Sequence, residues 1–155
     1  MTDQFSDSGS TDEPAAGEMP LPYVVAMVLC NSITLELGSN NITLHGCFSA
    51  IYAMSFPAVQ PKMAVYVALT NGRGNVPFRL LLVHSEGDIR PVFYVQGTIP
   101  FPDPLSTVEL RFPIPPVSFA QPGLYFLQMH VSNQFLMERR LLVMQVGGQD
   151  GESGL

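Results

Sequence analysis

The side chains best placed by type and spacing to do chemistry are His45 and Cys47. On an extended strand, residues i and i+2 share a face, so the imidazole could deprotonate the thiol and create a nucleophilic thiolate. Two ordinary side chains on one face of a sheet are the simpler explanation of the pair. We expect this simpler arrangement, because no Gly-x-Ser-x-Gly elbow or other nucleophile motif accompanies the pair.

A second candidate is the carboxylate pair Glu86 and Asp88, on either side of Gly87. Paired carboxylates can serve acid–base catalysis or bind Ca²⁺. Acidic side chains beside a glycine are also common turn formers. We therefore interpret this segment as a turn.

The three histidines, His45, His84 and His130, show no ligand spacing such as His-x-His or His-x-x-x-His. The glycine-rich segment 71–75 lacks the lysine and the following helix that a phosphate-binding loop needs, and it reads as a hairpin tip. No dinucleotide fingerprint is present. The sequence thus predicts no metal, no cofactor and no enzymatic activity.

The net charge of −6 is concentrated at the two ends of the chain. Residues 1–20 and 147–155 carry acidic side chains and no lysine or arginine. Between Leu21 and Val146, six acidic side chains face seven basic ones, so the body is close to neutral. A nucleic-acid-binding protein would show a basic cluster or stripe. We therefore expect no nucleic-acid partner.

The apolar segments are too short to cross a membrane, which takes about 18 or more uninterrupted residues. The first twenty residues are acidic and polar, unlike a secretion signal. We expect a cytoplasmic protein without a membrane span. In that compartment Cys30 and Cys47 would be free thiols.

Short apolar segments, alternating or continuous, recur roughly every 8–15 residues between turns rich in Gly, Pro, Asn and Ser. The pattern predicts an all-β domain over residues 21–146, an antiparallel β-sandwich of about nine strands with Ig-like, Greek-key connections. Residues 1–20 and 147–155 have little to bury and are predicted to be disordered acidic tails. We also expect residues 42–54 to form one long segment in which Gly46 marks a bulge or a bend between sheets. The strands on either side of the 71–75 turn are expected to pair as a hairpin.

The clearest structural signal is the segment Phe119–Val146. Pro122 and Gly123 would lead into a strand whose Tyr125 faces the core, and a polar turn at residues 132–134 would lead into a closing strand. Charged residues 138–140 interrupt the alternation of that strand, which predicts a bulge or a solvated edge.

Two segments, YVVAMVLCNSITLELGSNNITLHGCF and FAQPGLYFLQMHVSNQFLMERRLLV, together resemble a family of uncharacterised bacterial domains. Its members pair an early apolar strand and hairpin with a late Pro-Gly-x-Tyr hairpin, here Pro122–Tyr125. The chain departs from the family at the final turn, with Ser132-Asn133-Gln134 where Asp-Gly is common. The resemblance implies the sandwich fold and no established activity.

Several predicted strands are apolar on both faces, and only 13% of residues are charged. A sandwich alone in water should solvate its outer faces, so part of the surface is expected to meet a partner. We expect a non-catalytic protein-interaction or structural module that binds a protein partner or itself; a sandwich enclosing an apolar small molecule is the alternative, and a small enzyme ranks below both. The predicted interface residues are Arg139, Arg140, Leu142 and Met144, and the predicted structural residues are Pro122, Gly123 and Tyr125.

Overall fold

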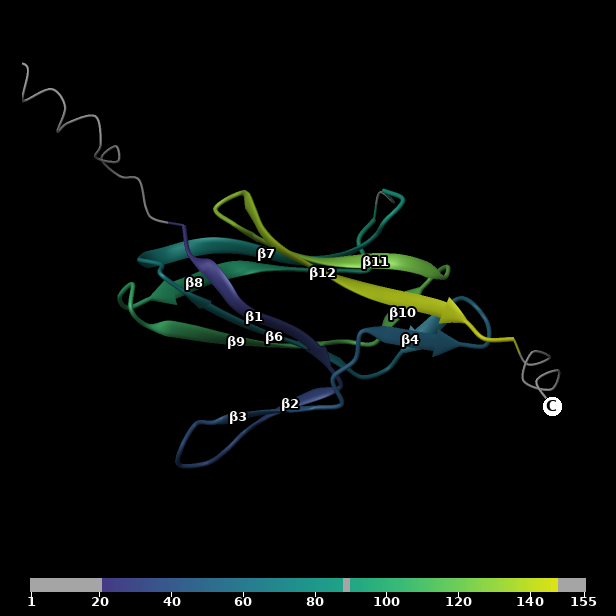
Figure 1. The fold of residues 1–155 in the computed structure, drawn as a ribbon, viewed down its shortest axis with the longest axis horizontal. Helices are drawn as coiled ribbons and strands as arrows, with labels where there is room; N and C mark the ends of the chain where they lie inside the picture. The colour runs from purple at the N-terminus through teal and green to yellow at the C-terminus, as the bar shows by residue number, and fades with distance from the viewer. Residues whose placement is uncertain (1–20, 88–89, 148–155) are drawn as a thin grey trace, which may run out of the picture.

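The computed structural model describes residues 21–87 and 90–147, and within them the chain forms a β-sandwich (Figure 1). The strands are β1 (Tyr23–Cys30), β2 (Ser32–Leu35), β3 (Ile42–His45), β4 (Ala50–Ala53), β5 (Ala58–Gln60), β6 (Met63–Thr70), β7 (Gly74–His84), β8 (Phe93–Phe101), β9 (Thr107–Ile114), β10 (Val117–Phe119), β11 (Gly123–Val131) and β12 (Gln134–Gln145). Apart from Gly147, the tails predicted to be disordered lie outside the described residues.

The two layers are a three-stranded sheet, in the order β1-β6-β9, and a five-stranded sheet, in the order β4-β12-β11-β7-β8. All neighbours are antiparallel except β12 and β4, which are parallel. Two small sheets, β2-β3 and β5-β10, lie beside these layers. The all-β sandwich prediction is confirmed. The described part has more strands than the nine expected, because three- and four-residue strands leave little periodicity in the sequence.

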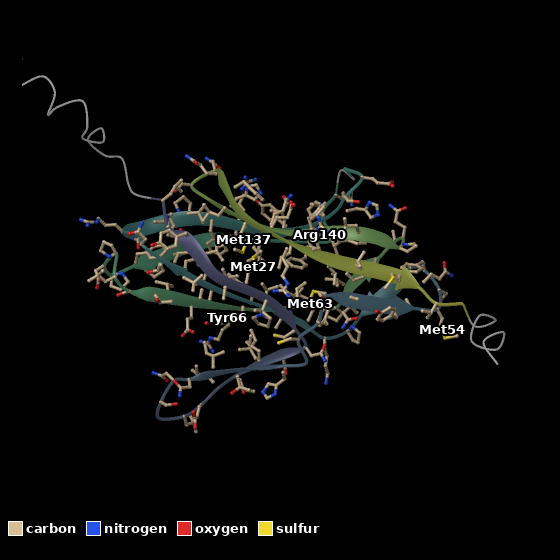
Figure 2. All side chains as sticks on the ribbon, viewed as in Figure 1. Met27, Met54, Met63, Tyr66, Met137 and Arg140 are labelled. Carbon is tan, nitrogen blue, oxygen red and sulfur yellow. The ribbon has the colours of Figure 1, made fainter. Side chains whose placement is uncertain are left out.

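The core lies between the two layers, where alternate residues of the main strands point inward and are buried or half-buried. This follows from the two-residue repeat of a β-strand, which sends alternate side chains to opposite faces. Figure 2 shows Met27 and Met137 between the layers. The fully buried side chains with the largest volumes include Phe119, Leu29, Leu69, Leu80, Leu82, Ile99, Leu127, Met129 and Leu141.

The predicted hairpin through residues 71–75 is wrong. Strand β6 pairs with β1 and β9, whereas β7 pairs with β11 and β8, so this turn carries the chain from one sheet to the other. The Asn71 amide donates to the Pro104 carbonyl oxygen, 3.0 Å away, which ties the turn to the β8–β9 connection. Both strands carry large apolar side chains, and stacking them in opposite layers buries these side chains against one another.

The long segment predicted over residues 42–54 is divided into β3 and β4, which belong to different sheets, in agreement with a bend between sheets at Gly46. Gly46 adopts a left-handed conformation (φ 66°) between them. This conformation breaks the strand and allows the chain to leave the β2–β3 hairpin for the five-stranded sheet. Figure 1 shows the hairpin standing out from the body of the sandwich.

The predicted closing hairpin is confirmed: β11 pairs over its whole length with residues 134–143 of β12. Ser132 and Asn133, at its tip, both have positive φ (52° and 64°), as a two-residue turn between twisted strands requires. Met129 pairs with Met137 and His130 with Phe135, so the bulge leaves Leu136 without a partner. The bulge therefore precedes the charged residues 138–140.

Candidate interaction surface

The outer face of the five-stranded sheet is apolar at the end where β4 and β12 finish. Its exposed large side chains there are Tyr52, Met54, Leu142, Met144 and Val146, which we name the β4–β12 patch. The parallel register places Tyr52 beside Met144, and Ala50 beside Leu142. Tyr52 and Met54 are 62% and 68% exposed. Single exposed apolar side chains are ordinary, so the significant observation is that several of them gather here. Figure 2 shows Met54 at this end of the molecule.

The patch continues across the sheet through half-buried apolar side chains. Leu142 pairs with Leu124 on β11, and two residues along β11 Phe126 pairs with Val83 on β7. Cross-strand neighbours on one face have Cβ atoms about 5 Å apart, so these side chains form one continuous surface. The outer face thus carries an apolar band that runs from the edge strand β4 to β7.

Charges of both signs border this band on β12. Glu138 and Arg140 are exposed and two residues apart, so both side chains lie on the outer face. The Gln128 side-chain amide donates to Glu138 Oε1, 3.0 Å away. Three of the predicted interface residues, Arg140, Leu142 and Met144, therefore lie exposed on the same face.

The fourth predicted interface residue, Arg139, has the opposite orientation. Its side chain is half-buried, and Nη1 donates a hydrogen bond to the Met27 carbonyl oxygen, 2.7 Å away. Met27 belongs to β1 in the other sheet and is buried. This bond between the layers argues against a place for Arg139 in an interface.

The predicted structural residues meet at the start of β11. Tyr125 is buried, and its hydroxyl donates to the Gln121 carbonyl oxygen at 2.5 Å. Gly123 has φ 139°, and a Cβ at this position would lie 2.6 Å from His84 Nε2. These contacts show that Tyr125 and Gly123 contribute to the packing at the start of β11.

His84 is the structural residue that the sequence did not single out. Its ring is buried and meets Tyr125 edge-on, with ring centroids 4.7 Å apart. The Glu86 amide donates to Nδ1 at 3.1 Å, and Nε2 lies 3.3 Å from the Pro122 carbonyl oxygen. Because a carbonyl oxygen can only accept, the ring proton resides on Nε2. Apart from its place on the apolar parity of β7, nothing in the sequence signals this role.

The residues first considered for catalysis lie apart from the patch. His45 Nε2 is 2.9 Å from Thr34 Oγ1 across the β2–β3 hairpin, and Cys47 is exposed beyond Gly46. Glu86 contributes its backbone amide to His84, and Asp88 lies outside the described residues. In the part of the chain that the structure describes, these residues do not come together in one site.

His130 lies at the other end of β11, half-buried, with its ring edge-on to Phe135. Burial lowers the pKa of His130, and the nearby positive charge of Arg79 lowers it further. Nε2 donates to Gln128 Oε1 at 3.3 Å. This geometry holds the ring in place.

Within residues 21–87 and 90–147, no group of three or more His, Cys, Asp or Glu side chains could hold a metal ion. The same residues contain no helix long and apolar enough to cross a membrane.

A family model described as a family of unknown function (DUF6941) matches residues 25–144. The chain belongs to this family. The match begins within β1, ends one residue before the end of β12, and includes most of the apolar band. DUF6941 is consistent with the uncharacterised family that the two sequence segments resemble.

No curated protein matches the chain. Among solved structures, the chain is similar to a β-D-glucoside glucohydrolase from Trichoderma reesei, with 11% sequence identity and a TM-score of 0.44. The likeness covers 90% of this chain and 21% of the enzyme chain. At this level it bears on neither the fold nor the function of the DUF6941 chain.

Proposed function

We propose that this DUF6941 protein is a non-catalytic interaction module that binds a second copy of itself through the β4–β12 patch. The observation that carries the proposal is the continuous apolar band on the outer face of the five-stranded sheet. Exposed apolar side chains gathered in one patch are typical of protein interfaces, whereas scattered ones are ordinary. Burying the band against a partner would remove its apolar surface from water.

The distribution of charge favours a second copy as the partner. Most closed dimers have two-fold symmetry, which brings the same surface of each subunit together. Glu138 and Arg140 lie two residues apart on one face and carry opposite charges, so the border of the patch on β12 has no net charge that would keep two copies apart. Such a surface suits a second copy in charge as well as in hydrophobicity.

The short edge of the five-stranded sheet favours contact through its outer face over contact through the edge itself. The edge strand β4 has only four residues and pairs with β12 over residues 142–145. A short edge strand offers few free backbone groups for pairing with another sheet. The apolar face offers much more contact surface than this edge.

The test is the mass of the protein in solution, measured by light scattering from about 1 to about 100 μM. We expect the wild-type chain to form a dimer that dissociates on dilution, and Leu142→Glu to remain a monomer with an unchanged melting temperature. Leu105→Glu is the matched control. Leu105 is 93% exposed in the β8–β9 connection, at the opposite end of the five-stranded sheet.

A wild-type protein that is monomeric over the whole range would overturn the proposal. So would a dimer that Leu142→Glu leaves intact, because the contact would then lie elsewhere. Dissociation by Leu105→Glu to the same degree would show a general effect of added negative charge and would also count against the patch.

An apolar small molecule is the second candidate, favoured by a cleft of about 400 Å³ between the β2–β3 hairpin and the three-stranded sheet. Its apolar lining comes from Ile33, Met63, Ala64 and Pro113. Small-molecule sites commonly have volumes of roughly 300–1,000 Å³ and largely apolar walls. Native mass spectrometry of the purified protein would show a retained ligand; a spectrum of the chain alone would reject this candidate.

A further inference from the structure

The two cysteines lie opposite each other at the base of the β2–β3 hairpin. Cys30 is the last residue of β1 and is buried, whereas Cys47 follows β3 and is exposed. Ser32 pairs with His45 at the end of the hairpin, and the left-handed Gly46 then interrupts the ladder, so that the Asn31 amide donates to the His45 carbonyl oxygen at 2.9 Å and also to that of Gly46.

Two backbone hydrogen bonds on either side of the cysteines support this pairing. The Asn31 amide donates to the Gly46 carbonyl oxygen at 3.1 Å, and the Phe48 amide donates to the Leu29 carbonyl oxygen at 3.0 Å. In an antiparallel ladder, bonds at these places define the enclosed residues as a non-hydrogen-bonded pair, whose Cα atoms are about 4.5 Å apart. That separation lies within the range of about 4.4–6.8 Å that disulfides span.

We propose that Cys30 and Cys47 are a redox modification site, whose two sulfur atoms join in a cross-strand disulfide that closes the base of the β2–β3 hairpin. The bond would fix Cys47 to the end of β1. It would thereby hold the hairpin in one position relative to the three-stranded sheet. Because Cys47 is exposed and Cys30 is buried, Cys47 would react first.

Cys47 is the thiol that meets the oxidant. Burial raises the pKa of Cys30, and the adjacent Cys47 raises it further, so Cys30 holds its proton more firmly than an ordinary thiol. Cys30 Sγ is also 3.7 Å from the Ala64 carbonyl oxygen, a weak contact that the new bond would replace.

The oxidant is a low-molecular-weight disulfide such as oxidised glutathione. The Cys47 thiolate attacks one of its sulfur atoms, forms a mixed disulfide and releases the first reduced thiol. Cys30 sulfur then attacks Cys47 sulfur and releases the second. The two protein thiols are oxidised, one small disulfide is reduced to two thiols, and the two thiol protons of the protein end on these products.

The experiment treats the full reduced chain with oxidised glutathione in its folded state and measures intact mass and peptide maps without reduction. We expect the wild-type chain to lose the mass of two hydrogen atoms, to carry no glutathione and to yield one linked peptide containing Cys30 and Cys47. Dithiothreitol should restore the original mass.

Two variants test the order of reaction. Cys30→Ala keeps the buried position apolar and should stop at a single glutathione adduct on Cys47. Cys47→Ser leaves only the buried thiol and should remain unmodified while folded. Circular dichroism would check the fold of both variants.

Three outcomes would overturn the proposal. The wild-type chain could accumulate the same glutathione adduct as Cys30→Ala, it could form disulfide-linked dimers, or it could keep both thiols. If Cys30→Ala failed to fold, the wild-type mass and peptide map alone would still decide the matter. Slower hydrogen exchange of the Asn31 and Phe48 amides in the oxidised protein is the further expected result, and unchanged exchange would show that the bond does not fix the hairpin.

Discussion

Arg139 Nη1 donates a hydrogen bond to the carbonyl oxygen of Met27, a residue that precedes it by 112 positions. The bond joins β12 of one sheet to β1 of the other. Over residues 134–141, β12 pairs with β11 on one side, whereas β4 begins to pair with it only at Leu142. The Arg139 side chain therefore links the layers along a part of β12 that lacks a second strand.

Replacement of Arg139 by Leu should destabilise the protein by about 1.5–3 kcal/mol, because a charged donor is lost and a carbonyl oxygen loses its partner. The neighbouring Arg140 is exposed on the opposite face, so Arg140→Leu should change the free energy of unfolding by less than about 0.5 kcal/mol. Urea denaturation of both variants measures the difference. Equal midpoints would show that the Arg139 bond contributes nothing.

The two arginines also show how far the sequence could predict the surface. The sequence predicted both arginines at the interface, although strand alternation sends adjacent residues to opposite faces. It could not say which arginine faces the core, because the bulge at Leu136 shifts the register. A long cationic side chain can also reach a carbonyl oxygen in another sheet, and such a contact depends on how the layers pack.

Gly123→Ala should destabilise the protein more than an ordinary substitution at a positive φ. The added Cβ would lie 2.6 Å from His84 Nε2 and would displace the ring from Tyr125 and the Pro122 carbonyl oxygen. Gly38 is the matched control, because it has φ 95° and no atom near the added Cβ. We expect about 1 kcal/mol for Gly38→Ala from strain alone and at least about 2 kcal/mol for Gly123→Ala.

Thermal unfolding of the two variants would measure how much more stability Gly123→Ala loses than Gly38→Ala. A cost at Gly123 no larger than that at Gly38 would mean that His84 moves aside freely. In that case, the packing of His84 against Tyr125 would not hold the start of β11 in place.

The Tyr125 hydroxyl provides a separate test of the same corner. Tyr125→Phe keeps the ring and removes the bond to the Gln121 carbonyl oxygen, so it should cost about 1 kcal/mol. Tyr125→Ala also removes a buried ring and should cost about 3 kcal/mol or more. Tyr94→Phe is the control, since the Tyr94 hydroxyl bonds the Gln96 side chain at the exposed surface. Chemical denaturation should show the largest loss of stability for Tyr125→Ala, a smaller loss for Tyr125→Phe and the smallest for Tyr94→Phe.

The sequence predicted the closing hairpin well because its signals are local: Pro122-Gly123 at the start, alternation along β11, and a polar turn. It predicted the 71–75 turn wrongly because a tight turn permits either pairing in one sheet or passage to the other. That choice depends on partners far away in the chain, such as the β6–β9 pairing. The position of Cys47 opposite Cys30 was likewise hidden, because it follows from the backbone bonds of Asn31 with Gly46 and of Phe48 with Leu29.

The last prediction concerns Tyr66, on the outer face of the three-stranded sheet. Its hydroxyl donates a hydrogen bond to Glu109 Oε2 on the neighbouring strand β9. Burial, then the hydrogen bond and the negative charge of Glu109, raise the pKa of Tyr66 from 10.0 to about 12. The spectrophotometric titration curve of Tyr66→Phe, subtracted from that of the wild-type protein, should isolate the ionisation of Tyr66 at this raised pKa.

The sign of the effect on stability follows from proton binding. Between pH 10 and about 12, the unfolded chain has released the Tyr66 proton while the folded chain still holds it. The stability that Tyr66 contributes is therefore complete below pH 10 and is lost as the pH rises toward 12. The urea midpoint should fall more steeply with pH in the wild-type protein than in Tyr66→Phe. Glu109→Gln should lower the Tyr66 pKa part of the way toward 10, because burial remains; a return all the way would assign the whole shift to the carboxylate.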